Sequence, residues 1–278
     1  MRLATFNLMH GRSPRDGRVE VGRFLDAVAA VDADVLALQE VDRGQPRSHR
    51  EDLAGRAADV MGARHRFVPT LYGTPGFGWT AVPSRDSRDG AGDAGPPGPQ
   101  YGIALLSRLP VRAWWTGRLT ASPMPSPLLL PGREGRLRLM RDEPRAVLAA
   151  RIQTPAGPLT VATTHLSFVP GWNALQLATV AGRLATLPGP HLLAGDLNLP
   201  GPVPGLVPGW RRLARLATYP AGRARVQFDH VLGHGDLPAV RGVRTVAAEV
   251  SDHLALVVEF DIPSGNAANA ARGVRSVR

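Results

Sequence analysis

Leu192-Leu193-Ala194-Gly195-Asp196-Leu197-Asn198 is the stretch that says most about the fold of this chain. An apolar run with strand character ends abruptly in two polar side chains, Asp196 and Asn198. Five further segments border an apolar run with polar groups in the same way, at Asn7, Gln39-Glu40, His165, Asp229-His230 and Asp252-His253. Sites of sheet-based enzymes form where strand ends converge, because rigid strands hold side chains accurately. The six segments together therefore predict one shared site.

Short β-type runs recur along the whole chain, and helical patterns lie between some of them. The runs cover residues 3–6, 35–38, 103–106, 146–152, 159–163, 191–194, 228–232 and 254–260. Three sets of apolar residues have helical spacing: Phe24, Leu25, Val28 and Val31; Leu53, Ala57, Val60 and Met61; and Trp172, Leu175, Val180 and Leu184. Strands mixed with helices in this manner predict an α/β or α+β domain.

The domain organisation follows from length and composition. With 278 residues, 44% of them hydrophobic, the chain can bury a sizeable core, and we expect one domain over residues 1–262. Two stretches rich in proline, 83–99 and 122–135, interrupt the pattern and are predicted to be flexible surface loops. Residues 263–278 are predicted to form a basic, disordered tail.

The composition also excludes several kinds of site. Without cysteine the chain has no disulfide framework, thiol nucleophile, zinc–thiolate site or iron–sulfur cluster. No apolar run approaches the roughly 18 residues of a membrane span. The first residues enter a strand-like segment and lack the apolar core of a signal peptide. We therefore expect a cytoplasmic protein.

The net charge of +10 comes from arginine alone, since the chain has no lysine. Such a charge favours an anionic partner, and the planar guanidinium suits phosphate. The abundance of Ala, Gly and Pro beside Arg offers a different explanation, a coding bias toward GC-rich codons. The basic cluster Arg211-Arg212-Leu213-Ala214-Arg215 is interpreted as a solvated helix face.

The residue types at the run borders indicate a divalent-metal phosphoesterase. Oxygen ligands such as Glu40, Asp196 and Asp252 suit Mg²⁺ or Mn²⁺ rather than zinc. Histidines beside carboxylates suit proton transfer and charge stabilisation at a phosphoryl group. Each residue alone also fits a turn, a solvated strand end or a core histidine, so the inference rests on the set. The chain has no G-x-S-x-G, Walker A or HExxH motif.

In this set the chain resembles the endonuclease/exonuclease/phosphatase superfamily, whose members have the DNase I-like fold. The matching pieces stand in the family's order from residue 1 to about residue 260. They are Thr5-Phe6-Asn7-Leu8-Met9-His10-Gly11, Leu38-Gln39-Glu40-Val41-Asp42, Tyr101-Gly102-Ile103-Ala104-Leu105-Leu106-Ser107-Arg108-Leu109-Pro110, Thr164-His165-Leu166, Gly195-Asp196-Leu197-Asn198, Phe228-Asp229-His230-Val231-Leu232 and Ser251-Asp252-His253.

The resemblance implies a four-layered sandwich of two packed mixed β-sheets flanked by helices, with the site at one edge. It implies that Glu40 is the principal ligand of Mg²⁺ or Mn²⁺, and that Asn7 and Asp252 complete the surroundings of the metal.

The resemblance also implies the catalytic roles. Asp196 would orient or deprotonate the attacking water, and Asn198 would hold a phosphate oxygen. His253, oriented by Asp229, would contact the phosphoryl group, and His165 would be the second histidine there. The expected reaction is in-line attack of water on the phosphorus of a phosphodiester or phosphomonoester.

Two further residues are candidate substrate ligands, His10 and Arg145. A structural role near the first strand is the alternative for His10, and a surface salt bridge is the alternative for Arg145.

The substrate class stays open between nucleic acid and a phospholipid or small phosphoester. A lipid hydrolase would expose apolar residues at the rim, for which Trp114, Trp115, Phe168 and residues 128–130 are candidates. A non-catalytic phosphate- or nucleic-acid-binding module on the same scaffold is the alternative function. No obligate protein partner is evident, and we expect a monomer.

Overall fold

A computed structural model describes residues 1–83, 87–88, 97–129 and 137–262 of the chain. It contains two seven-stranded sheets. The first has the order β15 (Val240–Val246), β16 (Ala255–Phe260), β1 (Arg2–Asn7), β2 (Val35–Arg43), β6 (Gln100–Ser107), β3 (Arg64–Thr74) and β4 (Gly78–Ala81). The second has the order β13 (Trp210–Arg212), β14 (Asp229–His234), β12 (His191–Asp196), β11 (Gly157–His165), β10 (Arg145–Thr154), β7 (Val111–Leu119) and β5 (Ser87–Arg88).

Smaller elements complete the described structure. Strands β8 (Ser126–Leu129) and β9 (Leu137–Met140) form a separate ribbon. The α-helices are α1 (Val21–Val31), α2 (Leu53–Met61) and α3 (Trp172–Ala185), and the 3-10 turns are η1 (Met9–Gly11), η2 (Pro46–Ser48), η3 (Val203–Leu206) and η4 (Ala221–Arg223).

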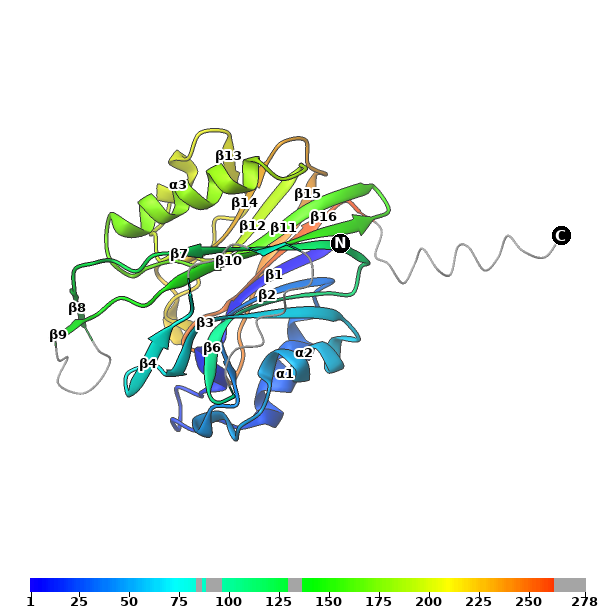
Figure 1. The fold of residues 1–278 in the computed structure, drawn as a ribbon. Coiled ribbons are helices and arrows are strands. Elements are labelled where there is room, and N and C mark those ends of the chain that lie inside the picture. Colours follow the sequence, from blue (N-terminus) through cyan, green and yellow to red (C-terminus); the bar gives the residue numbers. More distant parts are fainter. Residues whose placement is uncertain (84–86, 89–96, 130–136, 263–278) are drawn as a thin grey trace.

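The two sheets pack face to face and helices cover both outer faces, which gives four layers (Figure 1). Side chains such as Leu148, Leu105 and Val258 form the apolar core between the sheets. Helices α1 and α2 lie on the outer face of the first sheet, and α3 lies on the outer face of the second. The predicted four-layered sandwich of two mixed sheets is confirmed.

The helices form where their sequences allow a buried stripe and defined ends. In α1 the side chains of Phe24, Val28 and Val31 are buried at helical spacing. In α2 the Asp52 side chain caps the first turn by accepting from the Gly55 backbone N–H at 3.0 Å. Both helices therefore present one apolar face to the first sheet.

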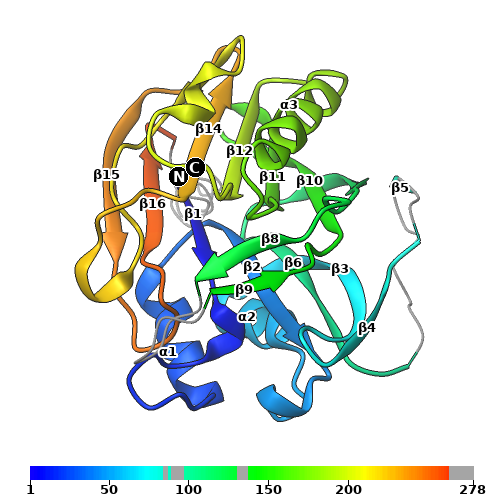
Figure 2. The same cartoon turned by 90° about the vertical axis from the view of Figure 1, so that its left-hand side faces the viewer.

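Parallel pairing brings the polar strand ends to one edge. Strand β1 pairs in parallel with β2, and β11 pairs in parallel with β12, so their carboxyl ends stop together. In these pairs Asn7 faces Gln39 and His165 faces Asp196. Strand β14 runs antiparallel to β12 and begins at Asp229, opposite Asp196. Figure 2 looks onto this edge, which the β8–β9 ribbon crosses.

All the predicted strands and three of the predicted helices are present, and some strands were not predicted. Each of the eight apolar runs lies in or overlaps a strand, and each of the three helical patterns falls in a helix. The helix expected at residues 211–215 is wrong, because Trp210–Arg212 pairs with β14 as strand β13. No helix within the described ranges is long and apolar enough to cross a membrane.

The predicted loops and tail lie partly or wholly outside the described residues. Within the stretch 83–99, Ser87–Arg88 pairs with β7 as strand β5. Within the stretch 122–135, Ser126–Leu129 is strand β8, because it pairs antiparallel with β9. Residues 84–86, 89–96, 130–136 and the predicted tail 263–278 are outside the described part of the chain.

Candidate active site

The site continues the apolar layer between the sheets, because alternate side chains of a strand point to the same face. On each strand an apolar start gives way to polar residues on that face. From core to site these side chains are Leu3, Thr5 and Asn7 on β1; Val35, Ala37 and Gln39 on β2; Val161, Thr163 and His165 on β11; and Leu192, Ala194 and Asp196 on β12. The polar site is therefore built directly on the core.

Glu40 reaches this site through a break in the alternation. It follows Gln39 directly, so regular β-structure would turn it toward the opposite face, where Leu38 packs under the helices. The pairing of β2 with β6 shifts between Leu38 and Val41, and Glu40 has a φ of +55°. A β-bulge of this kind re-aims a side chain beside an active site.

Asn7 holds two carboxylates from different sheets. Its Nδ2 donates to Glu40 Oε1 at 3.1 Å and to Asp196 Oδ2 at 3.0 Å. Its Oδ1 accepts from the Met9 backbone N–H at 3.0 Å. Burial raises the pKa of Glu40 to about 7; the Asn7 hydrogen bond opposes this rise, and the charges of Asp252 and Asp196 add to it. The amide thus separates carboxylates that repel one another.

His253 is a buried cation held by Asp229. Its Nδ1 lies 2.8 Å from Asp229 Oδ2, and its Nε2 lies 3.9 Å from Asp196 Oδ2. Burial lowers the pKa of His253, but the charge and hydrogen bond of Asp229 and the charges of Asp196 and Asp252 outweigh burial and raise it to about 10. The ring of Tyr219 packs 5.0 Å from the imidazole, centroid to centroid. The structure thus places Asp229 against His253 Nδ1, and the predicted catalytic roles of the two residues stay predictions.

His165 is neutral, in contrast to His253. Burial, helped by the charge of Arg145, lowers the pKa of His165 to about 3. Asn198 Nδ2 donates to His165 Nε2 at 3.3 Å and to the Leu166 carbonyl at 3.0 Å. An amide nitrogen only donates, so His165 Nε2 accepts and the ring proton lies on Nδ1. Both amide hydrogens of Asn198 are therefore in use, and its predicted phosphate contact stays a prediction.

Asp252 lies at the border of this cluster. It is half-buried in the segment before β16, and its backbone carbonyl accepts from the Ala221 N–H at 2.7 Å. Its charge contributes to the raised pKa of Glu40 and of His253. Asp252 is therefore within electrostatic reach of both groups.

Of the two predicted substrate residues, Arg145 lies within electrostatic reach of His165, and His10 follows Asn7 by three residues in the chain. Arg145 is 6% exposed, its Nη2 lies 3.4 Å from Asp142 Oδ1, and its Nε has no partner among the described residues. The alternative of a surface salt bridge is corrected to a buried one. His10 follows β1 in η1 with a φ of +49°, and burial, with Arg47 and Arg12 adding, lowers its pKa to about 3.

The donor set fits a hard divalent cation. Glu40, Asp196 and Asp252 offer carboxylate oxygens, which Mg²⁺ and Mn²⁺ prefer. Asp196, Asp229 and His253 also place ligand-type atoms within 4.8 Å of one another. Two of these three groups are already bound to each other, because His253 Nδ1 lies 2.8 Å from Asp229 Oδ2. Asn7 turns its amide nitrogen, not Oδ1, toward Glu40 and Asp196, and its predicted contact with the metal stays a prediction.

Several neighbours of the site were given no role from the sequence. Gln39 stands beside Glu40, and two consecutive polar residues at the end of a buried strand are the signal of the bulge. Thr218 accepts from the Asp229 backbone N–H at 3.2 Å, and Ser251 donates to the Asn7 carbonyl at 2.6 Å. Ser251 stands in the Ser251-Asp252-His253 piece of the family resemblance, whereas Thr218 depends on a tertiary contact and leaves no local sequence signal.

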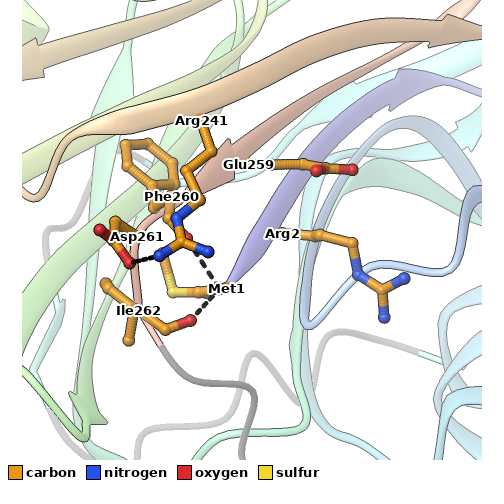
Figure 3. A pocket seen from close by; sticks show the side chains of 7 residues that line it. All are labelled: Met1, Arg2, Arg241, Glu259, Phe260, Asp261 and Ile262. Atoms are coloured by element: carbon orange, nitrogen blue, oxygen red, sulfur yellow. Dashed lines mark hydrogen bonds and ion pairs between the residues drawn. The ribbon is translucent and has the colours of Figure 1, made fainter.

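A separate hollow lies at the other end of β1 (Figure 3). It is lined by Met1, Arg2, Arg241, Glu259, Phe260, Asp261 and Ile262. Arg241 pairs with Asp261, and the Met1 amino group donates to the Phe260 carbonyl at 3.2 Å. Since six strand residues span roughly 20 Å, this hollow is remote from Asn7 and from the site.

The chain belongs to the endonuclease/exonuclease/phosphatase family, whose profile matches residues 4–253. The resemblance predicted from the motifs is confirmed by this match. No curated protein sequence matches the chain.

Solved structures share the fold at low identity. An endonuclease/exonuclease/phosphatase from Beutenbergia cavernae is 21% identical, with a TM-score of 0.60 over 93% of this chain and 70% of that one. The mannosyl-6-phosphatase of Bacteroides thetaiotaomicron is 13% identical, with a TM-score of 0.57 over 94% and 99%. The human Nocturnin catalytic domain is 17% identical, with a TM-score of 0.57 over 95% and 94%.

Proposed function

We propose that this protein is a Mg²⁺- or Mn²⁺-dependent phosphoesterase that cleaves its substrate by in-line attack of water on phosphorus. The observation that carries the proposal is the position of Asp196. Its Oδ2 lies 3.0 Å from Asn7 Nδ2, 3.7 Å from His165 Nε2 and 3.9 Å from His253 Nε2. One carboxylate thus faces a neutral histidine, a charged histidine and the group that holds Glu40.

Asp196 is the residue that orients the attacking water and accepts its proton. Its Oδ1 accepts from the Asn198 backbone N–H at 2.9 Å, which fixes the carboxylate. Its Oδ2 is shared with the Asn7 amide, so the carboxylate cannot rotate away. A general base must be held within hydrogen-bond reach of the proton that it takes, and these two contacts supply that constraint.

The two histidines have different tasks because their charges differ. His253 remains protonated and offers positive charge to the non-bridging oxygens as negative charge develops on the phosphoryl group. His165 is neutral with its proton on Nδ1, so it supplies hydrogen-bonding capacity without charge. Arg145 provides a second, buried cation within electrostatic reach of His165.

Glu40, with Asp252 beside it, would hold the metal ion, and the Asn7 amide nitrogen would hold the Glu40 and Asp196 carboxylates in place. When bound, the metal supplies Lewis-acid charge neutralisation at the phosphoryl oxygens.

The substrate class is the part of this proposal that a panel of substrates must decide. One structural relative is a mannosyl-6-phosphatase, so a sugar phosphomonoester belongs in the panel. Of the side chains considered for a lipid surface, Trp114 packs on the inter-sheet core and Trp115 on the core below α3. Because both rings pack against the core, they are less available to contact a lipid surface, which weakens the case for a phospholipid substrate.

The test is hydrolysis of bis-p-nitrophenyl phosphate, DNA, RNA, a sugar phosphate and sphingomyelin, each with Mn²⁺, with Mg²⁺ and with EDTA. We expect metal-dependent cleavage of one substrate class that is lost in Asp196→Asn. The matched control is Asp59→Asn, an exposed carboxylate on α2. Activity in EDTA, or full activity of Asp196→Asn, would overturn the proposal. Metal binding without cleavage of any substrate would favour the non-catalytic module.

A further inference from the structure

A buried chain of three polar side chains connects the two sheets directly below the site. Thr5 Oγ1 donates to Gln39 Oε1 at 3.1 Å within the first sheet. Gln39 Nε2 then donates to Thr163 Oγ1 of the second sheet at 3.0 Å. All three residues are 0% exposed. Because buried polar groups need partners, this chain fixes the separation of β2 and β11 at that level.

Gln39 also immediately precedes the bulge that turns Glu40 into the site. Its backbone carbonyl accepts from the Leu8 N–H at 3.0 Å, and its side chain is bound at both polar atoms. Glu40 next to it has a φ of +55°, an uncommon conformation that persists only where the surroundings enforce it. A residue anchored at its backbone and its side chain is such an enforcing neighbour.

Thr163 is placed near His165 and Asp196, much as Gln39 is placed near Glu40. It lies two residues before His165 on the same face of β11, and β11 pairs with β12 with Thr163 beside Ala194 and His165 beside Asp196. The Gln39–Thr163 hydrogen bond therefore joins the strand that carries Glu40 to the strand pair that carries His165 and Asp196.

We infer that Gln39 and Thr163 are positioning residues, whose hydrogen bond across the sheets sets the distance between the metal ligand Glu40 and the water-orienting Asp196. This inference rests on the proposed function. Residues that orient metal ligands without touching the metal cost about 10- to 100-fold in metal affinity or activity when removed. The Thr5–Gln39 hydrogen bond lies within the first sheet, so it holds the Gln39 side chain but does not connect the two sheets.

The experiment compares Gln39→Met and Thr163→Val with two controls. Thr163→Ser keeps the hydroxyl, and Thr5→Val removes a buried hydrogen bond of the same chain within one sheet. Mn²⁺ binding is measured by calorimetry without substrate, the unfolding free energy of the metal-free protein by urea titration, and kcat and KM on the best substrate.

We expect Gln39→Met and Thr163→Val to weaken Mn²⁺ binding about tenfold or more and to lower kcat with little change in KM. Thr163→Ser should bind Mn²⁺ within about threefold of the natural protein, and so should Thr5→Val even if it unfolds more easily. If Gln39→Met fails to fold, the Thr163→Val and Thr163→Ser pair decides. If Thr5→Val and Thr163→Val lost the same amount of Mn²⁺ affinity, the inference would be overturned. The Gln39–Thr163 hydrogen bond between the sheets would then matter no more than the Thr5–Gln39 bond within one sheet.

A Glu40→Gln variant separates this inference from the proposed function. If Glu40→Gln loses Mn²⁺ binding while Gln39→Met and Thr163→Val bind normally, the positioning role is wrong and the site assignment stands. If Glu40→Gln binds Mn²⁺ normally, the site assignment itself is wrong. In the combination of Gln39→Met with Glu40→Gln we expect no further loss of affinity, since Gln39 acts through Glu40.

Discussion

Besides Met9 and His10 in η1, three residues at the site have a left-handed backbone, which L-amino acids other than Asn and Asp adopt rarely. They are Glu40, Asn198 and Ser251, with φ values of +55°, +49° and +70°. Each is held by a hydrogen bond of the site: Glu40 by Asn7, Asn198 by Asp196, and Ser251 through its hydroxyl to the Asn7 carbonyl. Backbone strain clusters at functional sites, and here it is tied to the residues that position Asn7 and Asp196.

At the residue scale, Asp229 controls the charge of His253. The pKa of His253 is raised from 6.5 to about 10, so the pair stabilises the folded protein fully below pH 6.5 and the stabilisation is lost as pH rises through about 10. In Asp229→Asn burial dominates and the pKa falls. We expect the unfolding free energy of this variant not to fall as pH approaches 10. We also expect its kcat/KM to decrease at a lower pH than that of the natural protein, because His253 loses its proton earlier.

The measurement is urea unfolding and kcat/KM between pH 6 and pH 10.5. Asp59→Asn, on the exposed side of α2, serves as the control and should follow the natural protein. Identical pH profiles for Asp229→Asn and the natural protein would show that Asp229 does not set the charge of His253.

Protonation of Glu40 competes with metal binding. Burial raises its pKa to about 7, and a carboxyl group must lose its proton before it binds a cation. We expect the Mn²⁺ affinity to fall about tenfold for each pH unit below 7, and to level off above it. Glu40→Gln should bind Mn²⁺ more weakly and without this pH dependence. Calorimetry at pH 5.5 to 8.5 tests this, with Glu51→Gln as control; a flat profile for the natural protein would contradict it.

At the element scale, the closeness of β11 and β12 depends on Gly195. A Cβ on Gly195 would lie 2.0 Å from the Thr164 carbonyl oxygen, so Gly195→Ala must push the strands apart. We expect a loss of about 1–3 kcal/mol in unfolding free energy and a lower kcat, because His165 and Asp196 are neighbours across this pair.

Gly182→Ala is the matched control for the same substitution. Gly182 lies in α3, and a Cβ there meets nothing within 4 Å. This variant should gain about 0.5–1 kcal/mol and keep its activity, since alanine is the better helix former. A Gly195→Ala protein as stable and active as Gly182→Ala would mean that the strand spacing does not matter for catalysis.

At the scale of the whole molecule, a metal that binds only the folded site must stabilise the protein. At a Mn²⁺ concentration of 100 times Kd we expect the unfolding free energy to rise by about 2.7 kcal/mol, and EDTA to reverse the rise. Thermal or urea unfolding with and without Mn²⁺ measures it. Glu40→Gln should show little of the effect; a full rise in that variant would place the metal elsewhere.

The layered architecture was predictable because its main strands and helices have strong patterns. Strand β1, with Leu3 in the core and Asn7 at its end, shows both features in six residues. Strands β3 and β15 were missed because β3 begins with the exposed Arg64 and His65 and β15 has no buried residue, and pairing with β6 and β16 stabilises them. Residues 211–215 show the reverse error, since leucine and arginine at helical spacing lie in and after a strand that pairs with β14.

The sequence by itself determined the family, the residue types and the strand ends that carry them, because periodicity and motif order are local properties. Only the tertiary structure decided that Glu40 turns into the site, that Gln39 reaches Thr163, and that His253 is charged while His165 is neutral. These features depend on burial and on distances between segments far apart in the chain, such as Asn7 and Asp196. Such distances exist only once the two sheets have packed.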